Sequence, residues 1–409
     1  MRIILGSSSF GFGPISKLTA IGRALAPHQR ILLGDAVATG FADRNPGAFD
    51  EVVVPDSQPA SDALIRGADY VISVMDSDLV FRALALNRPV MFVDSLFAFW
   101  LLERSPAHIA HLCATVRQKG YDSIEEHLGA LSGHERQYAA HLLADVSAVQ
   151  NFPGVVERLE EIRGLGAERI HLVGSIVDDL TLKEVTDRRS GGPDLLLSLG
   201  GFKNFLLDFE RNNEYLRLFS RWMPDLLTDW PQFDRVVVCS GGFAGSRAER
   251  VEVAGRSADL RCLSQPEFMR ALGSARHCMM TPGLTAIHEA TVLNRLPMAL
   301  PEEHYGHIAN LAGLRGTFFE KLGSRFSDMV PDYRVPDDDF IGTAAIVDQI
   351  RPLLTDERAY ARFRRGMNER FEEFFALSSA EEAAGVAELR ELFAGPNFAD
   401  MLNVVFDPR

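Results

Sequence analysis

MMTPGLTAIHEATVLNRLPMALPEEHYGHIANLAGL, which runs from Met279 to Leu314, is the stretch that decides the fold. An apolar run ending at Met280 predicts a short buried strand, and the Pro282–Gly283 pair that follows it predicts a turn. Thr285 stands where the N-cap of a helix is expected, and apolar residues recur behind it at helical spacing. The stretch therefore predicts a strand, a glycine turn and a helix, which is the repeating unit of a parallel α/β sheet.

The turn before this predicted helix is suited to holding an anion. The first amides of a helix have no partner within the helix and the helix dipole favours negative charge there, so Gly283, Leu284 and Thr285 present a phosphate site. Glu289 lies about one helical turn further on, since ~3.6 residues make a turn, and a carboxylate there suits a diol such as a ribose. A diphosphate beside a ribose describes a nucleotide-sugar site. The alternative is an ordinary strand–helix unit that binds no ligand.

The same stretch resembles the donor-site signature of glycosyltransferases with the GT-B fold, in the style of the peptidoglycan N-acetylglucosaminyltransferase group. The residues that match the signature are Gly283, Thr285, Glu289, Pro297, Pro301 and Asn310. The chain departs from it at Arg295, where the family usually has Gly, and at His307, where the family usually has the Gln that contacts the sugar. The resemblance implies an α/β protein of two Rossmann-like domains that face each other across a cleft, with the nucleotide-sugar donor bound by the second.

The composition is that of a globular protein. The 409 residues are 46% hydrophobic and 24% charged, with a formal net charge of −14. An acidic surface argues against binding to nucleic acid and to anionic membranes. We find no signal segment at the start and no run of ~18 apolar residues, so we expect a cytoplasmic protein without a membrane span. The cysteines, which lack pair spacing, are expected to be buried free thiols: Cys113, Cys239, Cys262 and Cys278.

The N-terminus opens as Rossmann-like domains do. Residues 2–5 predict a strand, residues 6–13 a glycine-rich loop and residues 15–25 an amphipathic helix. In GT-B enzymes this loop faces the cleft, and many relatives carry a His there, which this chain lacks. The resemblance implies acceptor contacts for Phe12, Gly13 and Lys17. A solvated helix lysine is the alternative for Lys17.

Two later strand ends in this half provide carboxylates. Asp76 follows a buried strand predicted at residues 70–74, and Asp94 follows a strand at residues 89–93. Ligands bind beyond the carboxyl ends of parallel strands, so either carboxylate is a candidate catalytic base. A structural role is the alternative for Asp76, with Asp78 as the N-cap of the next helix.

The Asp76–Asp78 segment has the Asp-x-Asp form of metal-dependent glycosyltransferases, but that motif belongs to a different fold. Residues 105–145 contain five His without the spacing of a zinc helix, so we expect no metal site. Phe97 and Trp100 follow Asp94 and could form the base of a pocket that binds a flat acceptor. The alternative is an apolar lining where a loop covers the core.

The second half of the chain repeats the order of strand, glycine-rich loop and helix, beginning at Asp194. The strand at residues 194–198 and the glycines after it resemble the opening of a GT-B donor domain, whose loop faces the diphosphate. The resemblance implies donor contacts for Gly200, Gly201 and Lys203, and a nucleobase contact near Phe268. We expect an acceptor-binding domain over residues 1–178, a linker over 179–193, a donor domain over 194–390 and a segment over 391–409 that packs back on the first domain.

Together these observations predict an inverting, metal-independent glycosyltransferase. It would move a sugar from a nucleoside diphosphate sugar, with uridine as the expected base, to a small-molecule acceptor, without a cofactor. No nucleic acid or membrane partner is expected, and a homodimer is left open. The rival functions are a nucleotide-sugar hydrolase or epimerase and a catalytically silent nucleotide-sugar binder.

A narrower resemblance covers nearly the whole chain. The segments 11–13, 93–96, 150–154 and 198–201 are similar to cytosylglucuronate synthases, which join glucuronate from its uridine diphosphate donor to cytosine in nucleoside antibiotic pathways. Glu302 and Glu303 are unusual for a site that holds an acidic sugar.

Overall fold

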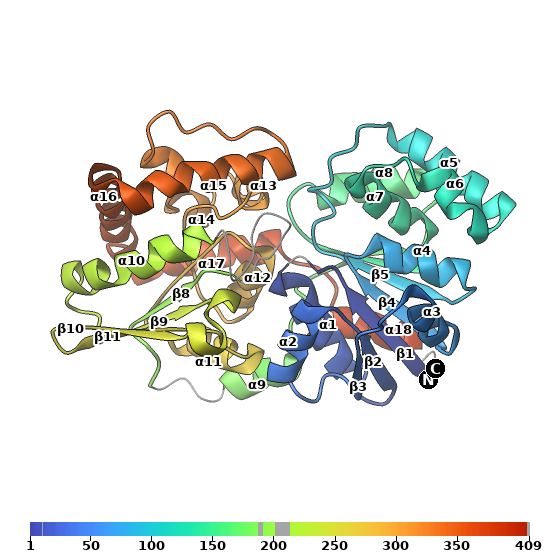
Figure 1. Ribbon diagram of the computed structural model, residues 1–409, viewed down its shortest axis with the longest axis horizontal. Helices are drawn as coiled ribbons and strands as arrows, with labels where there is room; N and C mark the ends of the chain where they lie inside the picture. The colour runs from blue at the N-terminus through green and yellow to red at the C-terminus, as the bar shows by residue number, and fades with distance from the viewer. Residues whose placement is uncertain (10, 187–190, 201–212, 407–409) are drawn as a thin grey trace. The chain divides into compact units, whose positions relative to one another are not determined.

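The computed structural model describes residues 1–9, 11–186, 191–200 and 213–406, and within them the chain forms two α/β units. Unit 1 comprises Met1–Ser9, Pro14–Asp178 and Leu392–Arg409, and unit 2 comprises Phe10–Gly13 and Asp179–Glu391. Each unit is built on one largely parallel sheet (Figure 1). The predicted class, an α/β protein with two Rossmann-like halves, is confirmed.

The sheet of unit 1 is parallel throughout, with the order β3-β2-β1-β4-β5-β6-β7. Its strands are β1 (Arg2–Ser7), β2 (Gln29–Leu33), β3 (Glu51–Val53), β4 (Tyr70–Val74), β5 (Val90–Asp94), β6 (Val146–Gln150) and β7 (Ile170–Val173). The α-helices described before residue 178 are α1 (Phe12–Ala24), α2 (Ala36–Arg44), α3 (Gln58–Arg66), α4 (Ser77–Ala85), α5 (Pro106–Lys119), α6 (Ile124–Leu128), α7 (Gly133–Leu143) and α8 (Val155–Gly164).

The sheet of unit 2 has the order β10-β11-β9-β8-β12-β13. Its strands are β8 (Leu195–Ser198), β9 (Arg235–Cys239), β10 (Glu249–Val253), β11 (Arg256–Arg261), β12 (His277–Met280) and β13 (Met298–Ala299). The described helices of this half are α9 (Asp179–Thr186), α10 (Glu214–Asp229), α11 (Gln265–Ser274), α12 (Leu284–Val292), α13 (Tyr305–Gly313), α14 (Phe318–Lys321), α15 (Asp339–Thr355), α16 (Glu357–Phe375) and α17 (Ser379–Leu392).

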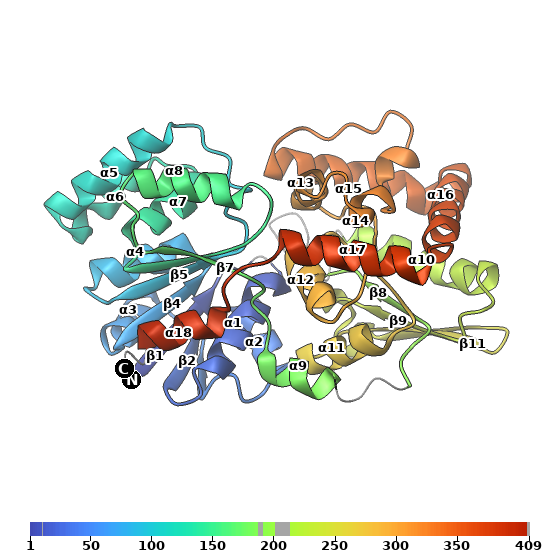
Figure 2. The same cartoon turned by 180° about the vertical axis from the view of Figure 1, so that it is seen from behind.

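The central strands are continuous apolar runs because both faces of each sheet are covered. Ile3–Leu5 in unit 1 and Leu195–Leu197 in unit 2 have no exposed side-chain surface. In unit 2, α10, α15 and α16 lie on one side of the sheet and α11 on the other (Figures 1 and 2). A parallel strand buried on both faces reads as an unbroken hydrophobic run rather than an alternating one, which is why the strand predictions were accurate.

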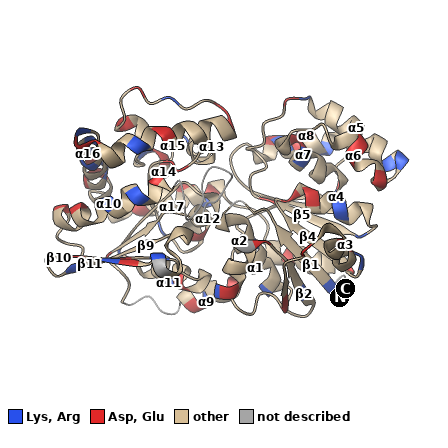
Figure 3. Ribbon diagram, viewed as in Figure 1, with Lys and Arg blue, Asp and Glu red and all other residues tan. Residues whose placement is uncertain are grey.

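One strand of unit 2 does not follow the parallel pattern. The strand β10 runs antiparallel to β11 and forms the edge of the sheet. Charged residues of both signs lie along this hairpin (Figure 3), and Arg250 pairs with Glu252 and Asp259. The strand β10 was not predicted from the sequence, because a segment rich in charged residues does not resemble a core strand.

The end of the chain returns to unit 1. The helix α18 (Phe398–Phe406) packs Phe406 against Tyr70, with ring centroids 4.9 Å apart, and comes to the front in Figure 2. The segment just before α18 is held by hydrogen bonds to unit 1. The side-chain amide of Asn151 donates to the carbonyl of Leu392, and the backbone amide of Gly174 donates to the carbonyl of Pro396 at 2.9 Å. A Cβ at Gly395 would clash with the Gly174 backbone at 2.6 Å, so only glycine permits this close crossing.

The segment expected to be a linker contains a helix. Residues 179–186 form α9, which packs against α11 through the buried Val185. Of the described helices, none is long and apolar enough to cross a membrane.

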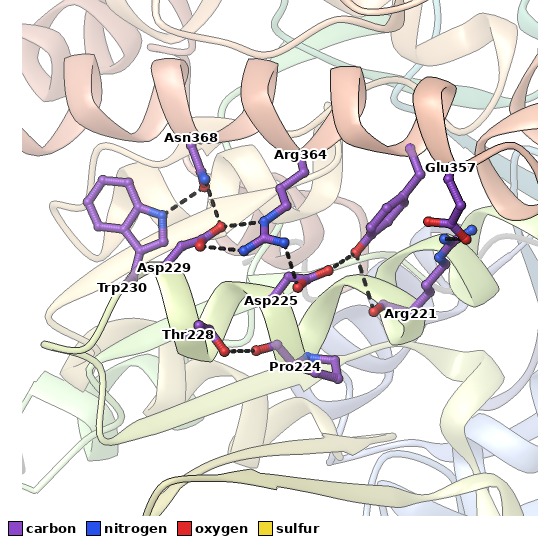
Figure 4. Close-up of polar contacts among 10 residues, drawn as sticks. Arg221, Pro224, Asp225, Thr228, Asp229, Trp230, Glu357, Arg364 and Asn368 are labelled. Atoms are coloured by element: carbon purple, nitrogen blue, oxygen red, sulfur yellow. Dashed lines mark hydrogen bonds and ion pairs between the residues drawn. The ribbon is translucent and has the colours of Figure 1, made fainter.

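A polar network joins α10 to α16 within unit 2 (Figure 4). The Arg364 guanidinium donates two hydrogen bonds to Asp229, at 2.7 and 2.6 Å, and forms an ion pair with Asp225. The Asn368 amide donates to Asp229 and accepts from the indole of Trp230. The Arg364 hydrogen bonds hold the pKa of Asp229 below its usual value.

The Asp229→Ala variant is expected to lower the free energy of unfolding by about 1–3 kcal/mol, because hydrogen bonds to a charged group are lost. Since the folded pKa of Asp229 is depressed, its contribution is present above the unfolded value of ~3.9 and is lost as the pH falls through the folded pKa. Urea unfolding followed by tryptophan fluorescence measures the difference from pH 7 down to pH 3. Asp348→Ala is the control, because its ion pair with Arg351 is exposed and should contribute about 0–1 kcal/mol. A difference that grows toward acid pH would contradict this assignment.

Candidate functional site

The candidate donor site lies where the strand order of unit 2 reverses direction. From β8 the chain continues to β9 on one side, whereas β12 pairs with β8 on the other. Parallel α/β sheets bind ligands beyond the carboxyl ends of strands at such a switch point. Gly200 follows β8 and Thr281 follows β12, and the Thr281 amide donates to the Ser198 carbonyl at 2.9 Å. A Cβ added to Gly200, whose φ is +71°, would lie 3.3 Å from Thr281 Oγ1.

The N-terminus of α12 opens at this switch point. Gly283 is its N-cap, in an extended conformation, and no side chain caps the helix. The prediction that Thr285 is the N-cap is wrong, because the chain turns helical directly after Gly283 and places Thr285 in the first turn. Leu284 is buried as the first helical residue. Without a side-chain cap, the helix dipole and backbone amides at this end suit an anion.

Glu289 lies on α12 and is 3% exposed. Its Oε1 accepts a hydrogen bond from Gln265 Nε2 at the start of α11. Phe268, the predicted nucleobase contact, is half-buried on the same helix. Glu289, the predicted ribose contact, and Phe268, the predicted nucleobase contact, therefore come from α12 and α11, which contact each other.

The loop after β13 completes this edge of the sheet. Its backbone is held by neighbours: the Tyr215 hydroxyl donates to the Pro301 carbonyl at 2.7 Å, and the Tyr305 amide donates to Thr343 Oγ1 at 3.1 Å. Glu302 Oε2 accepts from the Phe326 amide at 3.2 Å. These contacts fix the loop without using the side chain of Glu303.

His307 and Asn310 are buried on α13 beside this loop. The Asn310 amide donates to the Pro282 carbonyl at 2.8 Å, which fixes the turn before α12. The Glu303 amide donates to His307 Nδ1 at 3.1 Å, and the rings of His304 and His307 lie 3.7 Å apart. Burial lowers the pKa of His304 to about 3. Burial and the neighbouring His304 both lower the pKa of His307. Both rings are therefore neutral at pH 7.

Two predicted donor residues, Gly201 and Lys203, lie outside the described residues. Their proposed contacts with the diphosphate stay predictions.

Unit 1 has its own switch point, between β1 and β4. The chain proceeds from β1 to β2 on one side, and β4 lies on the other. Ser8 follows β1, and its amide donates to the Val74 carbonyl at 2.9 Å. Met75 follows β4 with a φ of +56°, an uncommon conformation for a residue other than glycine. Such strained residues concentrate at functional sites.

Asp76 comes directly after Met75 and is partly exposed. It is the N-cap of α4, and its Oδ1 accepts from the amides of Asp78 and Leu79, both at 3.1 Å. The prediction of Asp78 as the cap is therefore wrong: Asp78 lies in the first turn and pairs with Arg136. Burial, with the neighbouring Asp78 charge, raises the pKa of Asp76.

Asp94 differs from Asp76 because it has no exposed surface. It accepts hydrogen bonds from the Leu96 amide (2.6 Å), Trp100 Nε1 (2.5 Å) and His141 Nε2 (2.9 Å). His141 Nδ1 lies 2.5 Å from Ser147 Oγ on β6. Burial lowers the pKa of His141, so the ring is neutral, donating to Asp94 and accepting from Ser147.

The aromatic residues after Asp94 pack inward. Phe97 is fully buried and lies edge-on to His141, and Trp100 is 8% exposed. This packing favours the apolar-lining interpretation over a floor for an acceptor.

The remaining predicted acceptor residues lie at the start of α1. Phe12 and Gly13 are half-buried, whereas Lys17 is 1% exposed. The alternative of a solvated helix lysine is therefore wrong, because α1 turns Lys17 into the interior.

A separate depression of about 1050 Å³ lies on unit 1 between α3, α4 and α6. None of the predicted site residues lines it. Its two arginines already have acidic partners, Arg82 with Asp62 and Arg136 with Asp78 and Glu125.

Thr281 and Tyr215 were not singled out from the sequence. Thr281 faces Gly200 only because β8 and β12 pair, and Tyr215 reaches Pro301 from a helix far away in sequence. The threonine directly before Pro282 was a local signal, but nothing near Tyr215 in the sequence connects it to the site.

Comparisons with known proteins found no matching family model and no matching curated protein. Solved structures with a remotely similar course of the chain include a UDP-glucosyltransferase from Polygonum tinctorium capable of glucosylating indoxyl, with a TM-score of 0.45, 14% identity and coverage of 96% of this chain and 98% of that one. The spinosyn forosaminyltransferase SpnP has a TM-score of 0.44 and 13% identity, covering 99% and 98%. The calicheamicin glycosyltransferase CalG4 has a TM-score of 0.41 and 17% identity, covering 96% and 98%.

Proposed function

We propose that this chain is a glycosyltransferase that binds a nucleoside diphosphate sugar on unit 2 and transfers the sugar, with inversion, to a small-molecule acceptor. At such remote similarity the proposal rests on the chain's own residues. The observation that carries it is the uncapped N-terminus of α12 at the switch point of the sheet, with Gly200 and Gly283 leaving its backbone approachable.

The donor would lie along this edge with its diphosphate at the N-terminus of α12. As the bond between the sugar C1 and the diphosphate oxygen breaks, negative charge grows on the leaving group, and fixed amides and the helix dipole stabilise it. Glu289 is placed one helical turn further along to accept hydrogen bonds from the ribose diol. This chemistry needs no metal.

The acceptor needs a base to take its proton while it attacks C1. Asp76 is the better candidate of the two carboxylates, because it is partly exposed at the switch point of unit 1 and its pKa is raised. Asp94 is buried and already accepts three hydrogen bonds. A general base must reach the proton that it removes, which favours Asp76.

A ligand panel tests the proposal. Thermal unfolding is measured with uridine, thymidine and guanosine diphosphates and their sugars, since a ligand at 100 times its Kd stabilises the folded state by about 2.7 kcal/mol. Stabilisation by one nucleoside series, followed by transfer to an added acceptor, is expected. Free sugar released without an acceptor would indicate a hydrolase, binding without any turnover a silent binder, and no stabilisation by any member would refute the proposal.

Glu289→Ala tests the ribose contact. Loss of a charge-assisted hydrogen bond costs about 1.5–3 kcal/mol, so donor affinity should fall at least ~tenfold. Isothermal titration with the nucleoside diphosphate alone measures this loss without the sugar. Glu289→Gln keeps an acceptor for the Gln265 amide and should lose less. Donor affinity and turnover that are unchanged in the Ala variant would remove Glu289 from the site.

A further inference from the structure

We propose that Gln137 on α7 is a positioning residue for Asp76. Its side-chain amide holds the backbone of the turn between β4 and α4, and so fixes the carboxylate in the orientation that takes the proton of the acceptor. This inference rests on the proposed function, in which Asp76 is the base. It adds the group that keeps this base in place, which the sequence around Asp76 does not reveal.

The turn that carries Asp76 has a strained backbone. Met75 has a φ of +56°, a conformation that residues other than glycine seldom adopt. Residues in such conformations persist only where the surrounding structure holds them, and they concentrate at functional sites. The contacts that hold this turn therefore identify the residues that set the direction of Asp76.

Gln137 provides a contact that comes from another helix. Its Nε2 donates to the carbonyl of Met75 at 3.2 Å, although the two residues are 62 positions apart in the sequence. The Oε1 of the same side chain is buried and has no partner among the described residues. Burying an unsatisfied oxygen costs stability, which favours a functional role for this amide over a purely structural one.

The neighbouring residue on α7 holds the other side of the turn. Arg136 donates to Asp78 Oδ1 at 2.8 Å, in the first turn of α4. From the sheet, the buried hydroxyl of Ser73 donates to the carbonyl of Asp76 itself at 2.6 Å. Asp76 thus lies between Met75 and Asp78, which are both held by α7, and its own carbonyl is held by β4.

The two carboxylate oxygens of Asp76 have different surroundings. Oδ1 accepts from the amides of Asp78 and Leu79, whereas Oδ2 takes part in none of the hydrogen bonds among the described residues. The proton of the acceptor would therefore go to Oδ2, while the electron pair of the breaking bond to the sugar C1 stays with the leaving diphosphate. A base must lie within hydrogen-bonding reach of this proton, so a small movement of the turn loses the reach.

Gln137→Met tests the proposal, because methionine keeps about the same side-chain length and removes the amide donor. Turnover is measured with the donor that the thermal panel selects and the acceptor to which it is transferred. The kcat should fall at least ~tenfold, because the base is misplaced. The KM for the donor should stay within about twofold, because no donor contact is lost.

The pH profile separates positioning from stability. Burial, with the charge of Asp78, raises the pKa of Asp76, and Arg82 on the same helix acts against the rise. The base must be ionised, so turnover falls as the pH drops through this pKa. In Gln137→Met the loosened turn admits water to the carboxylate, which lowers its pKa. The acidic limb should therefore move to lower pH by about half a pH unit or more.

The same shift can be measured without a substrate. An NMR titration of isotope-labelled Asp carboxyl groups, with the Asp76 signal assigned from Asp76→Asn, reports the pKa directly. Ser73→Ala removes the second contact to the turn and should move the titration in the same direction. Gln118→Met makes the matched exchange at an exposed position of α5 and should change neither kcat nor the titration. Urea unfolding shows that each variant is folded.

The outcomes are distinguishable. If Gln137→Met lowers only the midpoint of urea unfolding and leaves kcat and the acidic limb unchanged, Gln137 is a structural residue and the proposal is overturned. Full turnover in Asp76→Asn would remove the base, and the positioning role with it, while donor binding would still support a glycosyltransferase. If no nucleotide binds, the proposed function fails, and the NMR titration alone decides whether Gln137 holds Asp76.

Discussion

Replacing Gly283 by Asp is expected to weaken donor binding by about a hundredfold or more, because it places a carboxylate at the N-terminus of α12 where the diphosphate would lie. Like charges in direct contact cost several kcal/mol, and 2.7 kcal/mol corresponds to a hundredfold. The fold should be unaffected, since the φ of Gly283 is an ordinary −83° and the space for a Cβ is open to 3.7 Å. Asp is moreover a favoured N-cap residue, so the helix should gain a few tenths of a kcal/mol.

This opposite effect on stability and binding makes the experiment informative. Gly283→Ala is the matched control, adding the Cβ without the charge, and it should lose at least ~tenfold less donor affinity than Gly283→Asp. Titration calorimetry and urea unfolding are measured on the same preparations. If Asp and Ala bind the donor equally well, no anion occupies the end of α12.

Asp94→Ala is expected to lower the free energy of unfolding by about 3–5 kcal/mol. The substitution leaves the indole of Trp100 and the imidazole of His141 without their acceptor inside a fully buried network, and each unsatisfied donor costs about 1–3 kcal/mol. Urea unfolding measures the loss. Asp78→Ala is the comparison. The Asp78 side chain is exposed, so its ion pair with Arg136 should contribute only about 0–1 kcal/mol to the free energy of unfolding.

Asp94→Asn separates structure from catalysis. It keeps an oxygen for one of the two ring donors, so it should fold with a smaller loss of stability and retain turnover. If the Asn variant instead folds normally and loses turnover, Asp94 is the base and Asp76 is not.

The sheets were predictable from local sequence because each central strand is buried on both faces. Leu195–Ser198 and Tyr70–Val74 read as short apolar runs bounded by turn residues, and they are strands. The first turn of a helix was harder to place. Asp76 and Asp78 are equally good caps by chemistry, and only the backbone conformation after β4 decides that Asp76 takes the role. The same applies to Gly283 and Thr285 at α12.

The site was predictable only where its residues are close in sequence. Gly283 and Glu289 share one helix, so their spacing could be read directly. The closeness of Gly200 to Thr281 could not be predicted, because it depends on the pairing of β8 with β12. The burial of Lys17 likewise depends on how α1 meets the sheet rather than on its own helical pattern.

The antiparallel strand β10 has a consequence for how copies of this protein behave together. An edge strand offers a row of backbone groups to which another chain can hydrogen-bond, and such edges seed aggregation. Here the exposed edge carries Glu249, Arg250 and Glu252, so a second chain pairing with it would have to bury those charges. A sheet ending at β11 would instead present Ala258 and Leu260 on an open edge. The charged hairpin thus disfavours pairing of another chain with this edge of the sheet.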